Sequence, residues 1–226
     1  MQRLFDILFS GAALVVLSPM FLALMVVLRL SGEGEIFFLQ ERIGRGGRRI
    51  KLFKFATMLK NSEHIGTGTV TLHKDPRILP IGGLLRKTKI NELPQLLNIF
   101  KGDMSVIGPR PQTQRCFDAF PEKSQAVIVR VRPGLSGVGS IVFRDEEKMM
   151  DDHGNADYFY DEMIMPYKGL LEEWYVGNQG LKTYLLSIFL TAWVVIFSRS
   201  QLPWRVFSQL PEPPSELAEL VNFPNA

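Results

Sequence analysis

The stretch ILFSGAALVVLSPMFLALMVVL, residues 7–28, decides the architecture of this chain, because none of its residues is charged. At about 1.5 Å per residue, a helix of this length can cross a hydrocarbon core of about 30 Å. The absence of a polar face argues against a buried helix of a soluble protein. The charged RLSGEGE that follows argues against a cleaved signal peptide. The sequence therefore predicts a membrane-associated N-terminal helix.

Ser18 and Pro19 interrupt this apolar stretch near its middle. A proline removes a backbone donor and kinks a helix, and a serine hydroxyl can satisfy a carbonyl freed within lipid. Such a kink fits either a single span or a re-entrant hairpin that enters and leaves by one face of the membrane. Because kinked spans are common, these residues alone favour the span.

The composition excludes several classes of protein. Of 226 residues, 46% are hydrophobic and 22% charged, which indicates a folded chain rather than a disordered one. A formal net charge of +3 is too small to indicate a nucleic-acid partner. The single cysteine, Cys116, rules out an intramolecular disulfide and a cysteine-based zinc site. The three histidines (His64, His73 and His153) lack metal-site spacing, and no P-loop or dinucleotide-binding motif is present.

Residues 42–60 carry seven lysines and arginines and no acidic residue. A basic run directly after a membrane segment is typical of a cytoplasmic loop. It can also contact anionic lipid or a phosphorylated substrate. A solvated loop that obeys only the charge rule is the alternative.

The remaining pattern predicts a mixed fold with mostly helical elements. The glycine-rich turn GRGG separates two short apolar runs and predicts a hairpin, and Asn91 is a plausible N-cap of a helix that Gly102 ends. The other expected elements are a helix at 121–132, a strand or loop at 134–143, a largely helical acidic region at 145–173, an in-plane or buried helix at 183–198, and an extended proline-rich tail at 201–226.

The chemistry that remains possible rests on carboxylates and basic side chains. Glu92 lies at the expected helix N-terminus, just after Arg86 and two lysines, and such an environment favours phosphate. Magnesium usually binds through one or two carboxylates together with substrate phosphates. Arg110 lies between two prolines in GPRP, a rigid setting that suits bidentate phosphate recognition. The alternatives are a helix-dipole role for Glu92 and a surface ion pair for Arg110.

Three segments carry a resemblance to a known family: ERIGRGGRRIKLFKFATM (41–58), DPRILPIGGLLRKTKINELPQLLNIFKGDMSVIGPRP (75–111) and VRPGLSG (131–137). In this order, after a Ser-Pro-broken apolar N-terminus, they resemble the bacterial sugar transferases, which are monotopic phosphoglycosyl transferases. The resemblance covers about residues 1–200 and corresponds to the small catalytic form of the family.

The resemblance implies an α/β, mostly helical enzyme on the cytoplasmic face of the bacterial inner membrane. It implies transfer of a sugar 1-phosphate from a UDP-sugar to undecaprenyl phosphate, with release of UMP and a requirement for magnesium, as the first membrane step of glycan assembly. Membrane lipids are expected partners, and a homo-oligomer is left open. The implied layout is a re-entrant helix hairpin broken at Ser18-Pro19 (1–30), a catalytic domain with in-plane amphipathic helices (31–200) and a C-terminal appendage (201–226).

The resemblance also assigns site residues and exposes one departure. The family's core is an Asp-Glu pair, in which the Asp attacks the sugar-bearing phosphorus and the Glu holds magnesium; here the pair is Asn91-Glu92. Asn91 occupies the nucleophile position, and a neutral amide is a poor nucleophile. Three explanations stay open: direct attack by the lipid phosphate, a covalent role for Glu92 or Asp103, and lost activity in a natural or engineered Asn form. A membrane scaffold or binding protein that retains the fold is the alternative function.

The basic side chains expected to bind substrate phosphates are Lys54, Arg77, Arg86 and Arg110. Lys54 matches a KFR-type segment of the family, although Ala56 stands where that segment has a second basic residue. PGLSGVGSIVFRDEE also departs from the family's PGITGWAQVNGR, which leaves the sugar and nucleotide pocket undefined.

Overall fold

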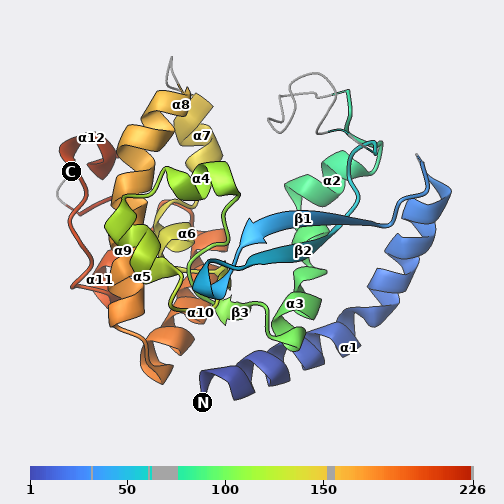
Figure 1. Ribbon diagram of the computed structural model, residues 1–226, viewed down its shortest axis with the longest axis horizontal. Coiled ribbons are helices and arrows are strands. Elements are labelled where there is room, and N and C mark those ends of the chain that lie inside the picture. Colours follow the sequence, from blue (N-terminus) through green and yellow to red (C-terminus); the bar gives the residue numbers. More distant parts are fainter. Residues whose placement is uncertain (32, 61, 63–75, 152–155, 225–226) are drawn as a thin grey trace. The chain divides into compact units, whose positions relative to one another are not determined.

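The computed structural model describes residues 1–31, 33–60, 62, 76–151 and 156–224, and shows a mostly helical α/β protein (Figure 1). This confirms the expectation of a mostly helical α/β fold. The chain forms two compact units. Unit 1 comprises Met1–Asp6, Arg42–Ile50 and Gly102–Ala226, and unit 2 comprises Ile7–Glu41 and Lys51–Lys101.

Unit 2 holds most of the N-terminal helix, most of a β-hairpin and the segment around Glu92. The two strands pair through a tight 3-10 turn, which confirms the hairpin predicted around GRGG. The elements of this part of the chain are α1 (Gln2–Leu30), β1 (Phe37–Ile43), the turn η1 (Arg45–Gly47), which belongs to unit 1, β2 (Arg49–Phe55), α2 (Gly82–Lys87), the 3-10 turn η3 (Ile90–Glu92) and α3 (Gln95–Lys101). Glycine at positions 46 and 47, where φ is +71°, supplies the backbone conformation that the turn needs.

Helix α1 continues without interruption through Pro19, and Figure 1 draws it as one bent ribbon. The Ser18 hydroxyl donates to the carbonyl oxygen of Val15 (2.7 Å), so it bonds a backbone carbonyl as expected. By length and composition, α1 is the one helix among the described residues that can cross a membrane, and only 6% of its most apolar window is buried. The re-entrant hairpin stays a prediction.

The core of unit 2 joins α1, the hairpin and α2. Leu28, Phe55 and Leu85 are buried together, and the rings of Phe21 and Phe55 meet edge-on with centroids 5.5 Å apart. A buried amide fixes the next helix: Asn98 donates to the carbonyl oxygen of Lys51 (2.9 Å) and accepts from the Phe53 N–H (3.0 Å). This pair of hydrogen bonds ties α3 to strand β2 and satisfies the buried side chain on both sides.

Unit 1 is built mainly from helices around one parallel strand pair. Its elements after the hairpin tip are β3 (Ser105–Ile107), α4 (Gln114–Asp118), α5 (Glu122–Ile128), β4 (Gly134–Ser136), α6 (Val138–Val142), α7 (Glu146–Asp151), α8 (Ala156–Phe159), a π-helix η4 (Tyr160–Ile164), α9 (Met165–Gly177), α10 (Leu181–Ile196), α11 (Leu202–Val206) and α12 (Ser215–Ala218). The helical character expected for 121–132 and 145–173, and the helix expected at 183–198, are confirmed in the described residues. Helix α10 is shorter than a membrane span, and its in-plane position stays a prediction.

Helix α9 is the central element of unit 1, packing against α5, α6 and η4. Ile107 of β3, Ile141 of α6 and Leu171 of α9 belong to one buried apolar cluster. Strands β3 and β4 pair in parallel, with Ser105 opposite Gly134. The two strands position the GPRP segment, which follows β3 directly.

Three local expectations need correction. Asn91 does not cap a helix, because it lies inside η3, and α3 begins only at Gln95, after Pro94. Residues 134–143 form the short strand β4 and then helix α6 rather than a strand or loop alone. The tail is not extended: it contains α11 and α12, and Trp204 and Leu217 are buried in the core cluster because their apolar surface packs there.

Candidate functional site

Glu92 lies against Lys54 in unit 2. The Lys54 ammonium is 3.4 Å from Glu92 Oε1, and about 15% of each side chain is exposed. The geometry follows from the fold, since Lys54 comes directly after Phe53, whose N–H is bound by Asn98 of α3. The sequence analysis predicts that Lys54 and Glu92 both belong to a phosphate-binding site, and the structure places them in contact.

Asn91 is buried beside this pair, with 9% of the residue exposed. Its side-chain oxygen has no hydrogen-bond partner among the described residues. Leaving a buried acceptor unpaired costs about 1–3 kcal/mol, so an amide in this position calls for a partner that the described chain does not supply. The backbone just before it is also unusual, because Lys89 has a left-handed φ of +58°.

Two of the predicted phosphate ligands in unit 2 have other contacts. Arg77 is buried, and its guanidinium donates to the carbonyl oxygen of Ser62 (2.7 Å). Arg86, in the last turn of α2, is 3.7 Å from the sulfur of Met58. Their contacts with substrate stay predictions. The three histidines lie outside the described residues.

Asp103 and Arg110 belong to unit 1. Arg110 lies in the GPRP segment, where the Gly134 N–H donates to the carbonyl oxygen of Pro109 (2.9 Å) and the Gly108 N–H to that of Ser136 (2.9 Å). These bonds fix the backbone on both sides of the segment to β4.

A buried carboxyl group forms a hydrogen bond with the backbone of the GPRP segment. Glu172 of α9 accepts backbone hydrogen bonds from Gly139 and Arg110, and its second oxygen has no partner among the described residues. Burial raises the pKa of the Glu172 carboxyl to about 7, while the nearby Lys168 ammonium and the two N–H groups act in the opposite direction. The Lys168 ammonium itself is bound by Glu146, at 2.7 and 2.9 Å.

We expect the free energy of unfolding to fall as the pH rises from 4.5 to about 7, the window set by the two pKa values of Glu172. The folded-state pKa is the higher one, so the stabilisation is complete below pH 4.5 and is lost as the pH rises to about 7. The size of the effect is about 3 kcal/mol. Unfolding followed by circular dichroism across this range measures it. Glu172→Gln should remove most of the change in the free energy of unfolding with pH, whereas Glu219→Gln, at an exposed position, should leave it unchanged. If both variants show the same pH dependence, Glu172 is not the group responsible.

Sequence reasoning missed Asp6, which is buried with 1% of the residue exposed. Its Oδ1 accepts hydrogen bonds from the hydroxyls of Ser105 (2.9 Å) and Tyr184 (2.9 Å) and from the Val106 N–H (2.9 Å). The signal was present, since Asp6 is the one acidic residue before Glu33. Asp6 directly precedes the uncharged stretch 7–28, so a membrane helix accounts for this part of the sequence without a role for the carboxylate.

Among the described residues, Glu92 is the candidate ligand for a metal ion at this site. Across the part of the chain that the structure describes, no three His, Cys, Asp or Glu side chains form a cluster. A single partly exposed carboxylate is nevertheless the donor set that magnesium uses when substrate phosphates complete its coordination. The residues present therefore fit a magnesium ion that arrives with a phosphorylated substrate.

Comparison with known proteins gives a consistent result. The sequence model of the family described as "Bacterial sugar transferase" matches residues 1–198. The exopolysaccharide production protein ExoY of Sinorhizobium fredii is 33% identical over 212 residues, which cover 88% of this chain and 86% of that protein.

Two relatives have names that state a reaction. The UDP-N-acetylgalactosamine-undecaprenyl-phosphate N-acetylgalactosaminephosphotransferase of Aeromonas hydrophila is 37% identical over 70% of this chain and 38% of its own length. The UDP-glucose:undecaprenyl-phosphate glucose-1-phosphate transferase of Escherichia coli is 33% identical over 62% of this chain and 31% of its own length. This chain thus spans less than half of either transferase.

Proposed function

Because this chain belongs to the bacterial sugar transferase family, we propose that it transfers a sugar 1-phosphate from a UDP-sugar to undecaprenyl phosphate and releases UMP. Such a step begins bacterial glycan assembly on the membrane. The observation that carries the proposal is the Lys54–Glu92 pair beside buried Asn91, within the segment that the family match covers. Relatives whose names state this kind of transfer support it.

We propose direct transfer as the mechanism. An oxygen of the lipid phosphate attacks the sugar-bearing phosphorus of the UDP-sugar, and a new P–O bond forms. The bond from that phosphorus to the bridging oxygen breaks, and UMP leaves with the electron pair. Phosphoryl transfer depends mainly on positioning and charge neutralisation, so a covalent carboxylate is not required.

The chain's own residues supply position and charge in this scheme. Lys54 neutralises phosphate oxygens beside Glu92, and Arg86 of the same unit is a further cationic candidate. The unpartnered oxygen of Asn91 supports a role in accepting a hydrogen bond from substrate. Magnesium held by Glu92 would supply Lewis-acid stabilisation of the diphosphate.

The membrane arrangement is also part of the proposal. Helix α1 would enter the cytoplasmic leaflet of the inner membrane as a hairpin bent at Ser18-Pro19, with α10 in the interface. The basic run at 42–60 and the low burial of α1 support this placement. It would let a lipid phosphate meet a soluble nucleotide sugar at headgroup level.

UMP release tests the function. The full chain in phospholipid nanodiscs, with undecaprenyl phosphate, magnesium and a panel of UDP-sugars, should release UMP with at least one sugar. Nucleotide-sugar binding without UMP release, with lipid and metal verified, would instead support a scaffold that retains the fold.

Intact-protein mass spectrometry separates the mechanisms. Direct transfer predicts that no phosphosugar adduct accumulates when UDP-sugar is supplied without lipid acceptor. An adduct on Glu92 or Asp103 would exclude direct attack and assign the covalent role to that carboxylate.

A further inference from the structure

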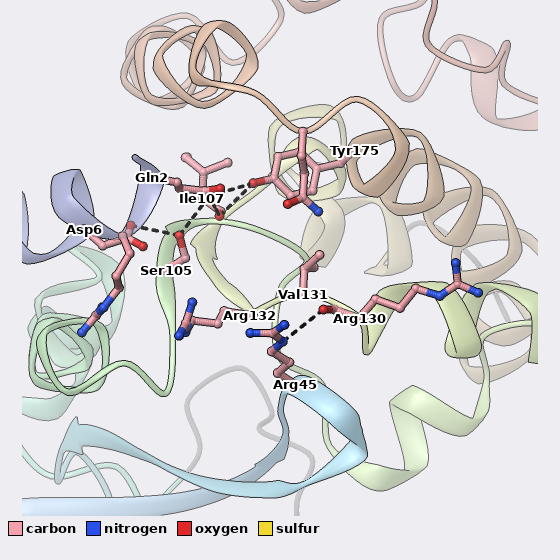
Figure 2. A pocket seen from close by; sticks show the side chains of 11 residues that line it. Gln2, Asp6, Arg45, Ser105, Ile107, Arg130, Val131, Arg132 and Tyr175 are labelled. Carbon is pink, nitrogen blue, oxygen red and sulfur yellow. Dashed lines mark hydrogen bonds between the residues drawn. The ribbon is translucent and has the colours of Figure 1, made fainter.

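Unit 1 contains a polar cavity of about 140 Å³, shown in Figure 2. It is lined by the first turn of α1, the hairpin tip, the start of β3, the segment before β4 and the end of α9. We call it the arginine pocket after three of the side chains that line it, Arg3, Arg45 and Arg132. Its volume is several times what one water molecule requires.

The wall opposite Arg45 and Arg132 is a hydrogen-bond network (Figure 2). The Gln2 amide donates to Ser105 Oγ, the carbonyl oxygen of Ile107 and the Tyr175 hydroxyl oxygen, each at 3.2 Å. The Tyr175 hydroxyl donates to the same carbonyl (3.0 Å), and the Ser105 hydroxyl donates to Asp6. These groups satisfy one another, so this wall is a fixed surface.

Arg45 and Arg132 present guanidinium groups whose Nε atoms are already bound. Arg45 Nε donates to the carbonyl oxygen of Arg130 (3.2 Å), and Arg132 Nε donates to that of Gly102 (2.9 Å). Within the described part of the chain, their terminal nitrogens have no hydrogen-bond partner. A guanidinium anchored at Nε and open at its terminal nitrogens is pre-organised for an oxyanion.

Arg130 lines the pocket in a different way. Its carbonyl oxygen faces the cavity, while its side chain extends away and donates to the carbonyl oxygen of Ala126 (3.2 Å) (Figure 2). It therefore adds no charge to the wall. The side chains that line the cavity otherwise include three arginines and one carboxylate, Asp6, whose Oδ1 is bound by three donors. The pocket is net positive, and the N-terminus of α1, a 29-residue helix, adds a further positive dipole.

From these contacts we propose that the arginine pocket binds a phosphate group, carried by a lipid headgroup or by a soluble phosphate compound. A doubly charged phosphate has enough acceptor oxygens for two guanidinium forks, and the cavity has room for it. Neither Lys54 nor Glu92 lines the pocket, and its occupancy needs no sugar transfer. Its ligand would fix the start of helix α1 against the hairpin tip within unit 1.

Phosphorus-31 NMR of inorganic phosphate tests the site, using the full chain in phosphatidylcholine nanodiscs with no nucleotide. Wild-type protein should broaden the phosphate resonance. Arg45→Gln/Arg132→Gln should weaken binding by about tenfold or more, because two charge-assisted contacts are lost. Arg48→Gln/Arg205→Gln, which removes two exposed charges from the same unit, should leave it unchanged.

Two further variants make the result decisive. Arg45→Lys keeps the charge but loses the planar fork, so intermediate binding is expected even if the double variant folds poorly. Lys54→Gln should retain the broadening, which separates this site from the Glu92 site. The proposal is overturned if wild type shows no broadening, or if the pocket variants broaden the resonance as wild type does.

Lipid composition then identifies the source of the phosphate. If a headgroup is the ligand, phosphatidic acid in the nanodisc should occupy the pocket and suppress the broadening by soluble phosphate. If a soluble compound is the ligand, the broadening should persist unchanged. Because neither measurement involves turnover, failure here is distinct from failure to release UMP.

Discussion

Glu92→Gln is expected to reduce UMP release by about a thousandfold, because it removes the carboxylate charge proposed to hold magnesium. Glutamine has almost the same shape, and the neighbouring ammonium of Lys54, 3.4 Å from Glu92 Oε1, can still contact its amide oxygen. Folding should therefore be preserved while metal-dependent activity is lost. The measurement is UMP release at saturating magnesium and undecaprenyl phosphate.

Asp103→Asn is the matched control for this change. It also removes one carboxylate charge, but from a residue that direct transfer does not use. The control should retain activity if the lipid phosphate attacks directly, and should lose it if Asp103 carries the covalent role. Rates close to wild type for Glu92→Gln would remove Glu92 from the mechanism.

Gly134→Ala is expected to lower the free energy of unfolding by about 3 kcal/mol, because β4 has no space for a side chain at this position. A Cβ on Gly134 would lie within 3.0 Å of Gly108 N and O and of Ser136 O, all of them backbone atoms. The strands would have to separate, which would break the hydrogen bonds that hold the GPRP segment. Thermal unfolding in detergent, followed by near-ultraviolet circular dichroism, measures the loss.

Gly177→Ala provides the comparison for this steric argument. Gly177 ends helix α9 in the same unit, and a Cβ there would meet no atom within 4 Å. Its unfolding should stay close to that of wild type. Equal stability of the two variants would show that β3 and β4 can move apart without cost.

Local patterns predicted much of this fold, and tertiary contacts account for the differences. The GRGG hairpin and the helix at 183–198 followed from turn chemistry and from the length of an apolar run, which depend on neighbouring residues only. The tail was misjudged because its five prolines suggest an extended chain, whereas Trp204 and Leu217 pack into a core formed by distant helices. Such packing leaves no local trace in the sequence.

In the candidate site, too, the residue types could be predicted from the sequence, but the tertiary contacts could not. The sequence indicated Glu92 and Lys54, which lie far apart along the chain, and the structure places them in contact. It did not indicate the amide of Asn98, which ties α3 to β2 and so sets that contact. It also did not indicate Glu172, because a glutamate in an acidic region, here followed directly by Glu173, is expected to be solvated until its burial is known.

The three hydrogen bonds to Asp6 have a consequence for how this protein can be altered. Helix α1 cannot be removed without loss to the rest of the protein, because its first turn is part of the packed structure of unit 1. Trimming the chain to obtain a water-soluble fragment would strip the carboxylate from Ser105, Val106 and Tyr184 and leave their donors unpaired. A chimaera or truncated form should therefore take the first turn of α1 and the rest of unit 1 from the same protein.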